Sequence, residues 1–320
     1  MKTKVIIIAG PTASGKTDLA IKLAQELNGE LINADSRQLY HGLDVGTNKG
    51  LLSATGEFIQ NNEVKLQAYE LEQSGIKGWL FNFLNPDESF DVNRFREYCL
   101  DLIERIVNKD KLPIIVGGTG LYIDALLKNY RLNDVKPNPK LRAELNLLST
   151  PTLFTKLQEL DEDKAASLNN SDRNNPHRLI RAIEIALGGS NETWVQQEVT
   201  NEYLLIYPKY EKEHLYEKIN KRVPQMFDEG MITETVKAIS TGYKDTEVLN
   251  GIGYKEVQQM LRGEITQEQA ITLTAQAHRN YAKRQITWFE GEGRGYELHR
   301  FDFKNEIEKI VNEVREFVNN

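Results

Sequence analysis

The sequence predicts an α/β fold, in which a parallel β-sheet is flanked by helices and interrupted by an inserted all-helical domain. Three observations support this prediction. Short apolar runs at residues 5–9 and 114–116 are typical of strands buried on both faces of a parallel sheet. Segments with helical apolar spacing alternate with these runs, and such alternation indicates parallel pairing. Between residues 124 and 200 no strand pattern is present, and helical segments are separated by Asn, Asp and Pro.

The chain opens with a strand, a glycine-containing loop and a helix. Residues 5–9 predict the strand, and residues 31–34 predict a second strand that ends at Asp35 and Ser36. Residues 48–78 are polar and rich in turn-forming types, and we interpret them as a surface excursion. The helix predicted over residues 16–27 rests on apolar residues at helical spacing, namely Leu19, Ala20, Leu23, Ala24 and Leu27.

The next helix and strand lead to a second glycine-rich turn. Residues 93–108 predict an amphipathic helix, and Cys99 lies in its apolar stripe, where packing is its expected role. The strand at residues 114–116 ends in Gly117-Gly118-Thr119-Gly120. The stripe of the helix comprises Phe95, Cys99, Leu102, Ile103, Ile106 and Val107.

The remainder of the chain suggests two domains. Residues 203–207 predict a strand that returns to the sheet, and residues 211–320 are mostly helical. We therefore expect a catalytic core of residues 1–123 and 201–320, with a helical insertion domain at residues 124–200.

Composition narrows the functional classes. The net charge of −7 argues against a whole-surface electrostatic grip on nucleic acid, although it permits a local basic groove. A single cysteine excludes an internal disulfide, and no Cys/His cluster indicates structural zinc. The apolar run before Gly10 is only five residues long, at residues 5–9, and no run approaches the ~20 residues of a membrane span. These features predict a cytoplasmic protein.

The clearest motif is a phosphate-binding loop of the P-loop NTPase type, which matches G-x-x-x-x-G-K-[ST] between a strand and a helix. The two glycines allow backbone N–H groups to form an anion nest, and the following helix adds the positive end of its dipole. Lys16 supplies a charge to the terminal phosphates, and Thr17 offers a hydroxyl to Mg²⁺. The loop consists of Gly10, Pro11, Thr12, Ala13, Ser14, Gly15, Lys16 and Thr17.

The residues at the ends of the neighbouring strands limit the reactions that this loop could serve. No Asp-Glu pair follows the strand at residues 114–116, which argues against a hydrolytic motor. Asp35 and Thr119 follow neighbouring strands, and the carboxyl ends of parallel strands line the ligand crevice. A carboxylate beside a phosphate site suits a general base, although Asp35 could instead cap a helix or support Mg²⁺. A kinase and a transferase that releases diphosphate both fit.

Several further segments resemble the tRNA dimethylallyltransferase (tRNA isopentenyltransferase, IPP transferase) family. The similarity covers roughly residues 4–290. In chain order, it comprises the loop at residues 10–17, the DSRQLY segment at 35–40, DVGTNK at 44–49, VGGTGLY at 116–122, NPHRLIRAIE at 175–184, GIGYKE at 251–256 and AKRQITWF at 282–289.

This resemblance implies transfer of a dimethylallyl group from dimethylallyl diphosphate to N6 of the adenosine 3′-adjacent to the anticodon. It implies that Asp35 takes the N6 proton and that Thr119 holds the amine or the bridging oxygen. The loop with Lys16, and with Mg²⁺ at Thr17, would stabilise the departing diphosphate. An assisting arginine is expected from three candidates: Arg181, Arg222 and Arg284.

The resemblance also implies an RNA partner, the anticodon stem-loop of tRNA. We expect the protein to be a monomer. The target base must leave its stack to reach the diphosphate. Basic groups in two places would supply local attraction: Arg173, His177, Arg178 and Arg181 in the insertion, and His278, Arg279, Lys283 and Arg284 near the end. The residues that match tRNA contacts of the family are Asp35, Ser36, Arg37, Gln38, Thr119, Arg142, His177, Arg178 and Arg181.

The sequence departs from the family pattern at one segment. Where the family usually has His-His-Leu-x-Asp, this chain has Gly78-Trp79-Leu80-Phe81-Asn82, and residues 50–77 are longer and more polar than usual. The phosphate loop and Asp35 are unaffected.

Other functions are compatible with parts of this pattern. A small-molecule or nucleoside kinase would share the loop and the carboxylate, but it would convert ATP to ADP and usually has an arginine-rich lid. A variant enzyme would prenylate a free adenine nucleotide. A non-catalytic RNA-binding protein would have no need for Lys16, Thr17, Asp35 and Thr119 together.

Overall fold

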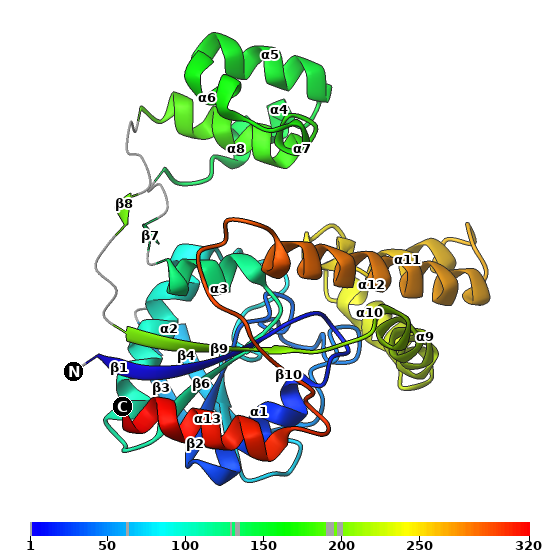
Figure 1. The fold of residues 1–320 in the computed structure, drawn as a ribbon. Helices are drawn as coiled ribbons and strands as arrows, with labels where there is room; N and C mark the ends of the chain where they lie inside the picture. Colours follow the sequence, from blue (N-terminus) through cyan, green and yellow to red (C-terminus); the bar gives the residue numbers. More distant parts are fainter. Residues whose placement is uncertain (1, 62–63, 129, 132–134, 190–194, 197–200) are drawn as a thin grey trace. The chain divides into compact units, whose positions relative to one another are not determined.

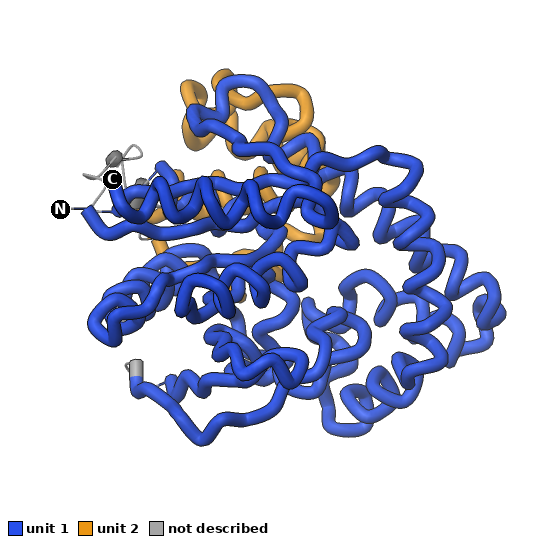
Figure 2. Tube along the Cα trace, turned by 60° about the horizontal axis from the view of Figure 1, so that its bottom comes forward, with its two compact units in different colours: residues 1–128, 198–320 blue, residues 129–197 orange. Residues whose placement is uncertain are grey.

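The computed structural model describes residues 2–61, 64–128, 130–131, 135–189, 195–196 and 201–320. The chain divides into two compact units. Unit 1 comprises residues 1–128 and 198–320, and unit 2 comprises residues 129–197, as coloured in Figure 2. Within the described residues, no helix has the length and apolar character needed to cross a membrane.

The described residues of the two units form the following strands and helices. The strands are β1 Thr3–Ala9, β2 Gly29–Asn33, β3 Leu52–Asn61, β4 Val64–Leu71, β5 Lys77–Trp79, β6 Leu112–Gly117, β7 Tyr130–Arg131, β8 Val195–Gln196, β9 Asn201–Pro208 and β10 His299–Phe301. The helices are α1 Lys16–Glu26, α2 Val92–Val107, α3 Gly120–Leu127, α4 Pro139–Leu145, α5 Thr150–Leu160, α6 Glu162–Ser167, α7 Asn170–Arg173, α8 Pro176–Leu187, α9 Lys212–Asp228, α10 Met231–Ser240, α11 Tyr254–Leu261, α12 Gln267–Glu290 and α13 Ile307–Asn319, with a short 3₁₀ turn at Val248–Asn250.

Unit 1 is built on one eight-stranded sheet with the order β10-β9-β1-β6-β2-β5-β4-β3. Its pairs are parallel from β10 to β5 and antiparallel from β5 to β3. Strand β6 lies between β1 and β2, and the three strands are parallel. The segments that follow them therefore meet at the carboxyl-terminal edge of the sheet. The candidate site forms at this edge.

Helices cover both faces of the central strands, which explains their continuous apolar runs. On one face, α1 and α13 pack on Ile6, Ile8 and Val116. Figure 1 shows α2 and α3 on the opposite side of the sheet from α1 and α13. Ile7 and Ile115 belong to the same strands and are fully buried as well.

The predicted elements of the central sheet are confirmed. The helix expected at residues 16–27 is α1, that at 93–108 is α2, and the returning strand at 203–207 is β9. Cys99 is a buried free thiol, and burial raises the pKa of that thiol well above its usual value. Val107 is 37% exposed, so its predicted place in the packed stripe of α2 is wrong, since it is the last residue of the helix.

The prediction of a surface excursion at residues 48–78 is wrong. This segment forms β3, β4 and β5, which extend the sheet as an antiparallel hairpin. Only one face of the hairpin is covered: Leu66 and Ala68 of β4 are buried, while Lys65 is exposed. Polar residues therefore alternate with small apolar groups, a pattern that composition alone does not distinguish from a loop.

The C-terminal part of unit 1 is mostly helical, as expected, although β10 adds a short parallel strand next to β9. Helix α12 starts with a capping box between Thr266 and Gln269. It packs on α9 and α11 around Ile219, Val223 and Val257, which are fully buried. The loop after β1 contacts this cluster through Ala13.

Unit 2 contains α4 to α8 around its own small core, which includes Leu153, Leu179 and Ile183. The Asn, Asp and Pro residues that separate its helices act at their starts. Side chains of Asn138, Ser149, Asp161, Asn169 and Asn175 each accept a backbone hydrogen bond at a helix N-terminus. The expectation that residues 124–200 contain no strand is wrong in one detail, because β7 and β8 pair over two residues, too few to produce a sequence pattern.

Candidate active site

The phosphate loop connects β1 to α1 with the geometry that its glycines require. Gly10 has a φ of 149° and lies against Pro208, so a β-carbon there would approach the proline ring to 2.7 Å. Gly15 has a φ of 85° and directly precedes Lys16, the first residue of α1. The N-terminal amides and the dipole of α1 thus lie at the end of the loop, where an anion is stabilised.

Lys16 is held over this loop. Its Nζ donates to the Pro11 carbonyl at 2.7 Å. Burial lowers the pKa of Lys16 to about 8, while Asp35 acts in the opposite direction and Arg222 lowers the pKa further. An arriving anion would favour the charged form of the amine. Lys16 is therefore poised to bind a phosphate rather than to stabilise the fold.

Asp35 and Thr119 come together at the ends of β2 and β6. The Thr119 Oγ1 accepts from the Ser36 amide at 2.9 Å, and the Thr119 amide donates to the Ala34 carbonyl at 3.1 Å. This contact requires Gly117, because a β-carbon there would lie 2.3 Å from the Ala34 backbone. The hydroxyl of Thr119 and the carboxylate of Asp35 thereby follow adjacent strands beside the loop.

Only one oxygen of the Asp35 carboxylate accepts a hydrogen bond from a described residue. Its Oδ1 accepts from the Arg37 amide at 2.9 Å, and no described residue donates to its Oδ2. Buried Asn33 fixes the turn, since its Oδ1 accepts from the Asp35 amide at 3.0 Å and its Nδ2 donates to the Leu80 carbonyl at 3.0 Å. Asp35 is half-buried, and one carboxylate oxygen is available to a substrate proton.

Gln285 of α12 ties the two glycine-containing loops together. Its Oε1 accepts from the Thr12 amide at 2.8 Å, and its Nε2 donates to the Gly118 carbonyl at 2.9 Å. A β-carbon at Gly118 would lie 2.1 Å from this amide nitrogen, so a side chain there would displace the Gln285 amide. One side chain from the C-terminal part of the chain therefore sets the spacing between the phosphate loop and the turn that carries Thr119.

The three candidate arginines occupy different environments. Arg222 of α9 donates to Thr12 Oγ1 at 3.2 Å from both terminal nitrogens, and burial lowers its pKa while Asp35 opposes this effect. Arg284 is exposed and lies 5.6 Å from the Tyr281 ring centroid. Arg181 belongs to unit 2. Arg222 therefore contacts the phosphate loop.

Several buried polar atoms around the loop have no hydrogen-bond partner among the described residues. They include Ser14 Oγ, Arg222 Nε and both ring nitrogens of His278. Burial lowers the pKa of His278 to about 3, and Arg222 lowers it further, so the ring is neutral at pH 7. The predicted membership of His278 in a cationic cluster is therefore wrong: the ring faces the packed side of α12 instead of solvent.

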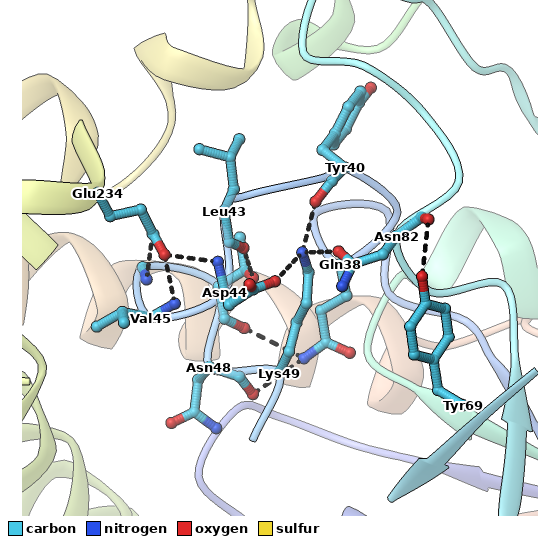
Figure 3. A network of polar contacts seen from close by, with 12 residues as sticks. Gln38, Tyr40, Leu43, Asp44, Val45, Asn48, Lys49, Tyr69, Asn82 and Glu234 are labelled. Atoms are coloured by element: carbon cyan, nitrogen blue, oxygen red, sulfur yellow. Dashed lines mark hydrogen bonds and ion pairs between the residues drawn. The ribbon is translucent and has the colours of Figure 1, made fainter. Parts of the chain in front are cut away.

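The segment after Asp35 is braced by a buried lysine, as Figure 3 shows. Lys49 Nζ donates to the Tyr40 carbonyl, to Asp44 Oδ1 at 2.7 Å and to Asn82 Oδ1. Burial lowers the pKa of Lys49, whereas Asp44 acts to raise it. Gln38 Nε2 donates to two carbonyls of the same loop, at residues 47 and 48. This network holds the backbone of residues 35–49 in one conformation.

Helix α10 supports the other side of this loop. Glu234 accepts from the amides of Asp44, Val45 and Gly46 at 2.7, 2.8 and 2.9 Å (Figure 3). Its Oε1 also accepts from the Tyr254 hydroxyl at 2.6 Å. Tyr254 starts α11 directly after the GIGYKE glycines, so this C-terminal signature contributes to positioning the 44–46 turn.

The segment that departs from the family pattern is structurally integrated. Trp79 is buried, and its Nε1 donates to Glu30 at 2.8 Å. Asn82 supplies an acceptor to Lys49, so the amide takes part in the brace of the 35–49 loop. The segment therefore has structural partners within unit 1.

The basic residues of unit 2 form a different kind of surface. Arg142 makes a two-point contact with the buried Glu184 at 2.8 and 2.9 Å, and Arg181 reaches the same carboxylate at 3.3 Å. Arg178 pairs with Asp172 and remains 53% exposed, while His177 is exposed. Arg142 and Arg181 therefore stabilise the helical unit, whatever else they bind.

Sequence reasoning did not single out Gln285, Lys49 or Glu234 as site residues. Gln285 and Lys49 lie inside segments that were noted for their resemblance, whereas Glu234 lies outside them. Their roles depend on contacts with residues as far away as Thr12, from which Gln285 is separated by 273 positions. The sequence carried no local signal that identified these contacts.

Comparisons with known proteins agree with this geometry. Residues 65–292 match the sequence profile of a family described as IPP transferase, and residues 3–72 match one described as isopentenyl transferase. A tRNA dimethylallyltransferase of Acetivibrio thermocellus is 37% identical over 325 residues, which cover 98% of this chain and 97% of that protein. One from Clostridioides difficile is 36% identical over 324 residues, with 98% and 96% covered.

Solved structures give the same result. The full-length tRNA isopentenylpyrophosphate transferase of Bacillus halodurans superimposes with a TM-score of 0.69 and 34% identity, covering 99% of this chain and 97% of the other. A eukaryotic dimethylallyltransferase described as acting on tRNA gives a TM-score of 0.73 and 26% identity, covering 99% and 80%.

Proposed function

This chain belongs to the IPP transferase family and is a tRNA dimethylallyltransferase, and we propose that Asp35, Thr119, Lys16 and Arg222 carry the reaction. The enzyme transfers a dimethylallyl group from dimethylallyl diphosphate to N6 of the adenosine 3′-adjacent to the anticodon of tRNA. The C1–O bond to diphosphate breaks, the N6–C1 bond forms, and N6 loses one proton.

Asp35 is proposed as the acceptor of that proton. Its free Oδ2 and its position at the end of β2 support this role, because a general base must come within hydrogen-bond distance of the proton. Thr119 would orient the N6 amine, since its hydroxyl is fixed by the Ser36 amide. The turn at Asn33 holds both groups in place and so limits the reorganisation needed during the reaction.

The diphosphate would be held by the nest of amides at residues 10–17. Lys16 keeps a pKa of about 8, which leaves most of the amine charged at pH 7, and a bound anion would raise that fraction. Arg222 adds a guanidinium at Thr12. Negative charge grows on the diphosphate as the C1–O bond breaks, so these fixed cations act most strongly on the transition state.

The residues present also fit Mg²⁺. Thr17 is exposed in the first turn of α1, and the described residues contain no cluster of His, Cys, Asp or Glu that would form a complete protein site. This suits an ion that retains waters and takes most of its ligands from substrate phosphates. Thr17 would hold the ion, which would neutralise charge on the diphosphate.

For tRNA recognition, we propose that Asp35, Ser36, Arg37 and Gln38 contact the target base and its neighbours, together with Thr119. The hydrogen bonds that Gln38 donates to the carbonyls of residues 47 and 48 support that role, because they brace this segment. In unit 2 we propose contacts to the anticodon stem-loop from Arg142, His177, Arg178 and Arg181. Because one unit of one chain supplies all the reacting groups, we propose that the enzyme acts as a monomer, in the cytoplasm where tRNA is modified.

The observation that carries the proposal is the meeting of the segments that follow β1, β2 and β6: Arg222 donates to Thr12 of the phosphate loop at 3.2 Å, and Thr119 accepts from the Ser36 amide, next to Asp35, at 2.9 Å. Purified protein with Mg²⁺, dimethylallyl diphosphate and unmodified tRNA should yield dimethylallyladenosine and diphosphate in equal amounts, and ATP should remain intact. Conversion of ATP to ADP without prenylated tRNA would instead identify a kinase, and equal modification of free adenine nucleotide would exclude tRNA as the required acceptor.

A further inference from the structure

One pocket in unit 1 has no role in the proposed reaction. It has a volume of about 320 Å³, close to the lower end of ligand pockets, which span roughly 300–1,000 Å³. The β3–β4 hairpin supplies one wall, and the segment on either side of Asn82 supplies the other. Its lining residues are His41, Val64, Lys65, Gln67, Asn82, Phe83 and Glu88.

The pocket adjoins the segment that we assign to RNA contact. The Asn82 amide donates to the Gln38 carbonyl at 3.3 Å, and the Phe83 amide donates to the Leu39 carbonyl at 2.8 Å. The His41 amide donates to the Leu84 carbonyl at 2.8 Å. With a further bond from the Leu84 amide to the Leu39 carbonyl at 3.1 Å, four backbone bonds join the pocket wall to residues 38–41, which follow residues 35–37.

The lining groups suit a nucleotide rather than a simple anion. Lys65 is exposed and carries a positive charge, whereas Glu88 carries a negative one, so the pocket has no strong net charge. Burial and the nearby Lys49 lower the pKa of His41, which makes its ring a neutral hydrogen-bonding and stacking group. Phe83 lines the pocket with an aromatic ring that is 8% exposed and also packs against Phe90 and Tyr98, and Gln67 contributes an amide.

Asn82 is a fixed hydrogen-bond donor in this pocket. Its Oδ1 accepts from Lys49, which orients the amide, and its Nδ2 donates to no described residue (Figure 3). An aspartate at this position would have no donor. The amide at residue 82 therefore gives the pocket a hydrogen-bond donor that a carboxylate would lack.

We propose that this pocket binds one unstacked nucleotide of the anticodon loop, adjacent to the target adenosine. Its base contacts Phe83 and is read by the amides of Asn82 and Gln67, with Glu88 as an acceptor for an exocyclic amine. Lys65 binds the backbone phosphate. Unstacked single-stranded bases are recognised by this combination of aromatic, amide and basic groups. The inference rests on the proposed function, since it assumes an RNA substrate at Asp35.

The test compares a double variant, Lys65→Ala with Gln67→Ala, with the wild type and with Lys22→Ala, an exposed lysine on α1. Lys65 and Lys22 are exposed and Gln67 is half-buried, and thermal unfolding confirms that each protein is folded. The probe is an unmodified anticodon stem-loop RNA, with binding measured by fluorescence anisotropy. The double variant should bind it about tenfold more weakly and show an equal rise in KM for RNA. Its kcat at saturating RNA and its KM for dimethylallyl diphosphate should not change, and Lys22→Ala should match the wild type.

An abasic series through the loop tests base recognition. At one position beside the target adenosine, loss of the base should weaken wild-type binding about tenfold and leave the double variant unaffected. Equal RNA affinity in the double variant and the wild type, or the absence of any such position, would overturn the inference. A wild-type protein that binds the stem-loop through the pocket but never prenylates it would contradict the proposed function alone.

Discussion

Gln285→Leu tests whether one side chain sets the geometry of the phosphate site. The change keeps the side-chain volume nearly constant but leaves the Thr12 amide and the Gly118 carbonyl without their partner. A buried polar group left unpaired costs about 1–3 kcal/mol. The Gly118 contact is buried and the Thr12 contact is partly buried, so we expect unit 1 to lose about 2–4 kcal/mol of unfolding free energy. The loop would also lose its fixed distance from Thr119.

Two measurements check this expectation. Urea unfolding gives the free-energy loss, and steady-state kinetics should show KM for dimethylallyl diphosphate raised about tenfold or more, because a small displacement of binding groups is costly. Gln276→Leu is the matched control, since Gln276 is exposed on the same helix. If Gln285→Leu and Gln276→Leu were equally stable and equally tight for dimethylallyl diphosphate, the role assigned to Gln285 would be wrong.

Further predictions concern the base, the arginine, the buried histidine and the charge of the RNA site. Asp35→Asn should abolish transfer while stem-loop affinity persists, and near-normal turnover would refute the base assignment. Arg222→Ala should slow single-turnover transfer about a hundredfold or more at saturating substrates, while Arg284→Ala should not; equal effects would remove the distinction between them. The pKa of His278 is about 3 in the folded protein, against an ordinary 6.5. Between pH 6.5 and pH 3 the unfolded chain therefore binds one proton more than the folded protein does. The free energy of unfolding should fall by about 1.4 kcal/mol per pH unit as the pH drops below 6.5. Urea unfolding from pH 7 to 5 should show this slope, and His278→Gln should lack it; identical slopes would mean that the ring is not buried in its neutral form. Stem-loop affinity should weaken with added salt, and salt-independent binding would exclude a role for the basic residues.

Local patterns were sufficient for the centre of the fold. Strand β1 is buried on both faces, so its residues form a continuous apolar run. Helix α1 is buried along one stripe, so its apolar residues recur at helical spacing. Both patterns can be recognised within a short stretch of sequence. The β3–β4 hairpin could not be recognised in this way, because one of its faces is exposed and its strands pair with a register shift between Ala54 and Phe58. Strand β10 is three residues long and pairs with a strand about 90 positions earlier.

The same division applies to the site. The phosphate loop is contiguous, and the strand-end rule for parallel sheets pointed to Asp35 and Thr119. Arg222 was one of three indistinguishable arginines until the packing of α9 placed it on Thr12. The neutral state of His278 likewise depends on burial between helices. Its neighbours in the sequence are basic, so the local pattern indicated an exposed cationic cluster instead.

A structure of the enzyme with an anticodon stem-loop and a non-hydrolysable analogue of dimethylallyl diphosphate would test the central claim most directly. We expect the diphosphate group to bind the amides of residues 10–17, with one oxygen at Lys16 Nζ. The adenine N6 should lie about 3 Å from the Asp35 carboxylate. A diphosphate bound away from Lys16, or an adenine whose N6 lies beyond the reach of Asp35, would contradict it.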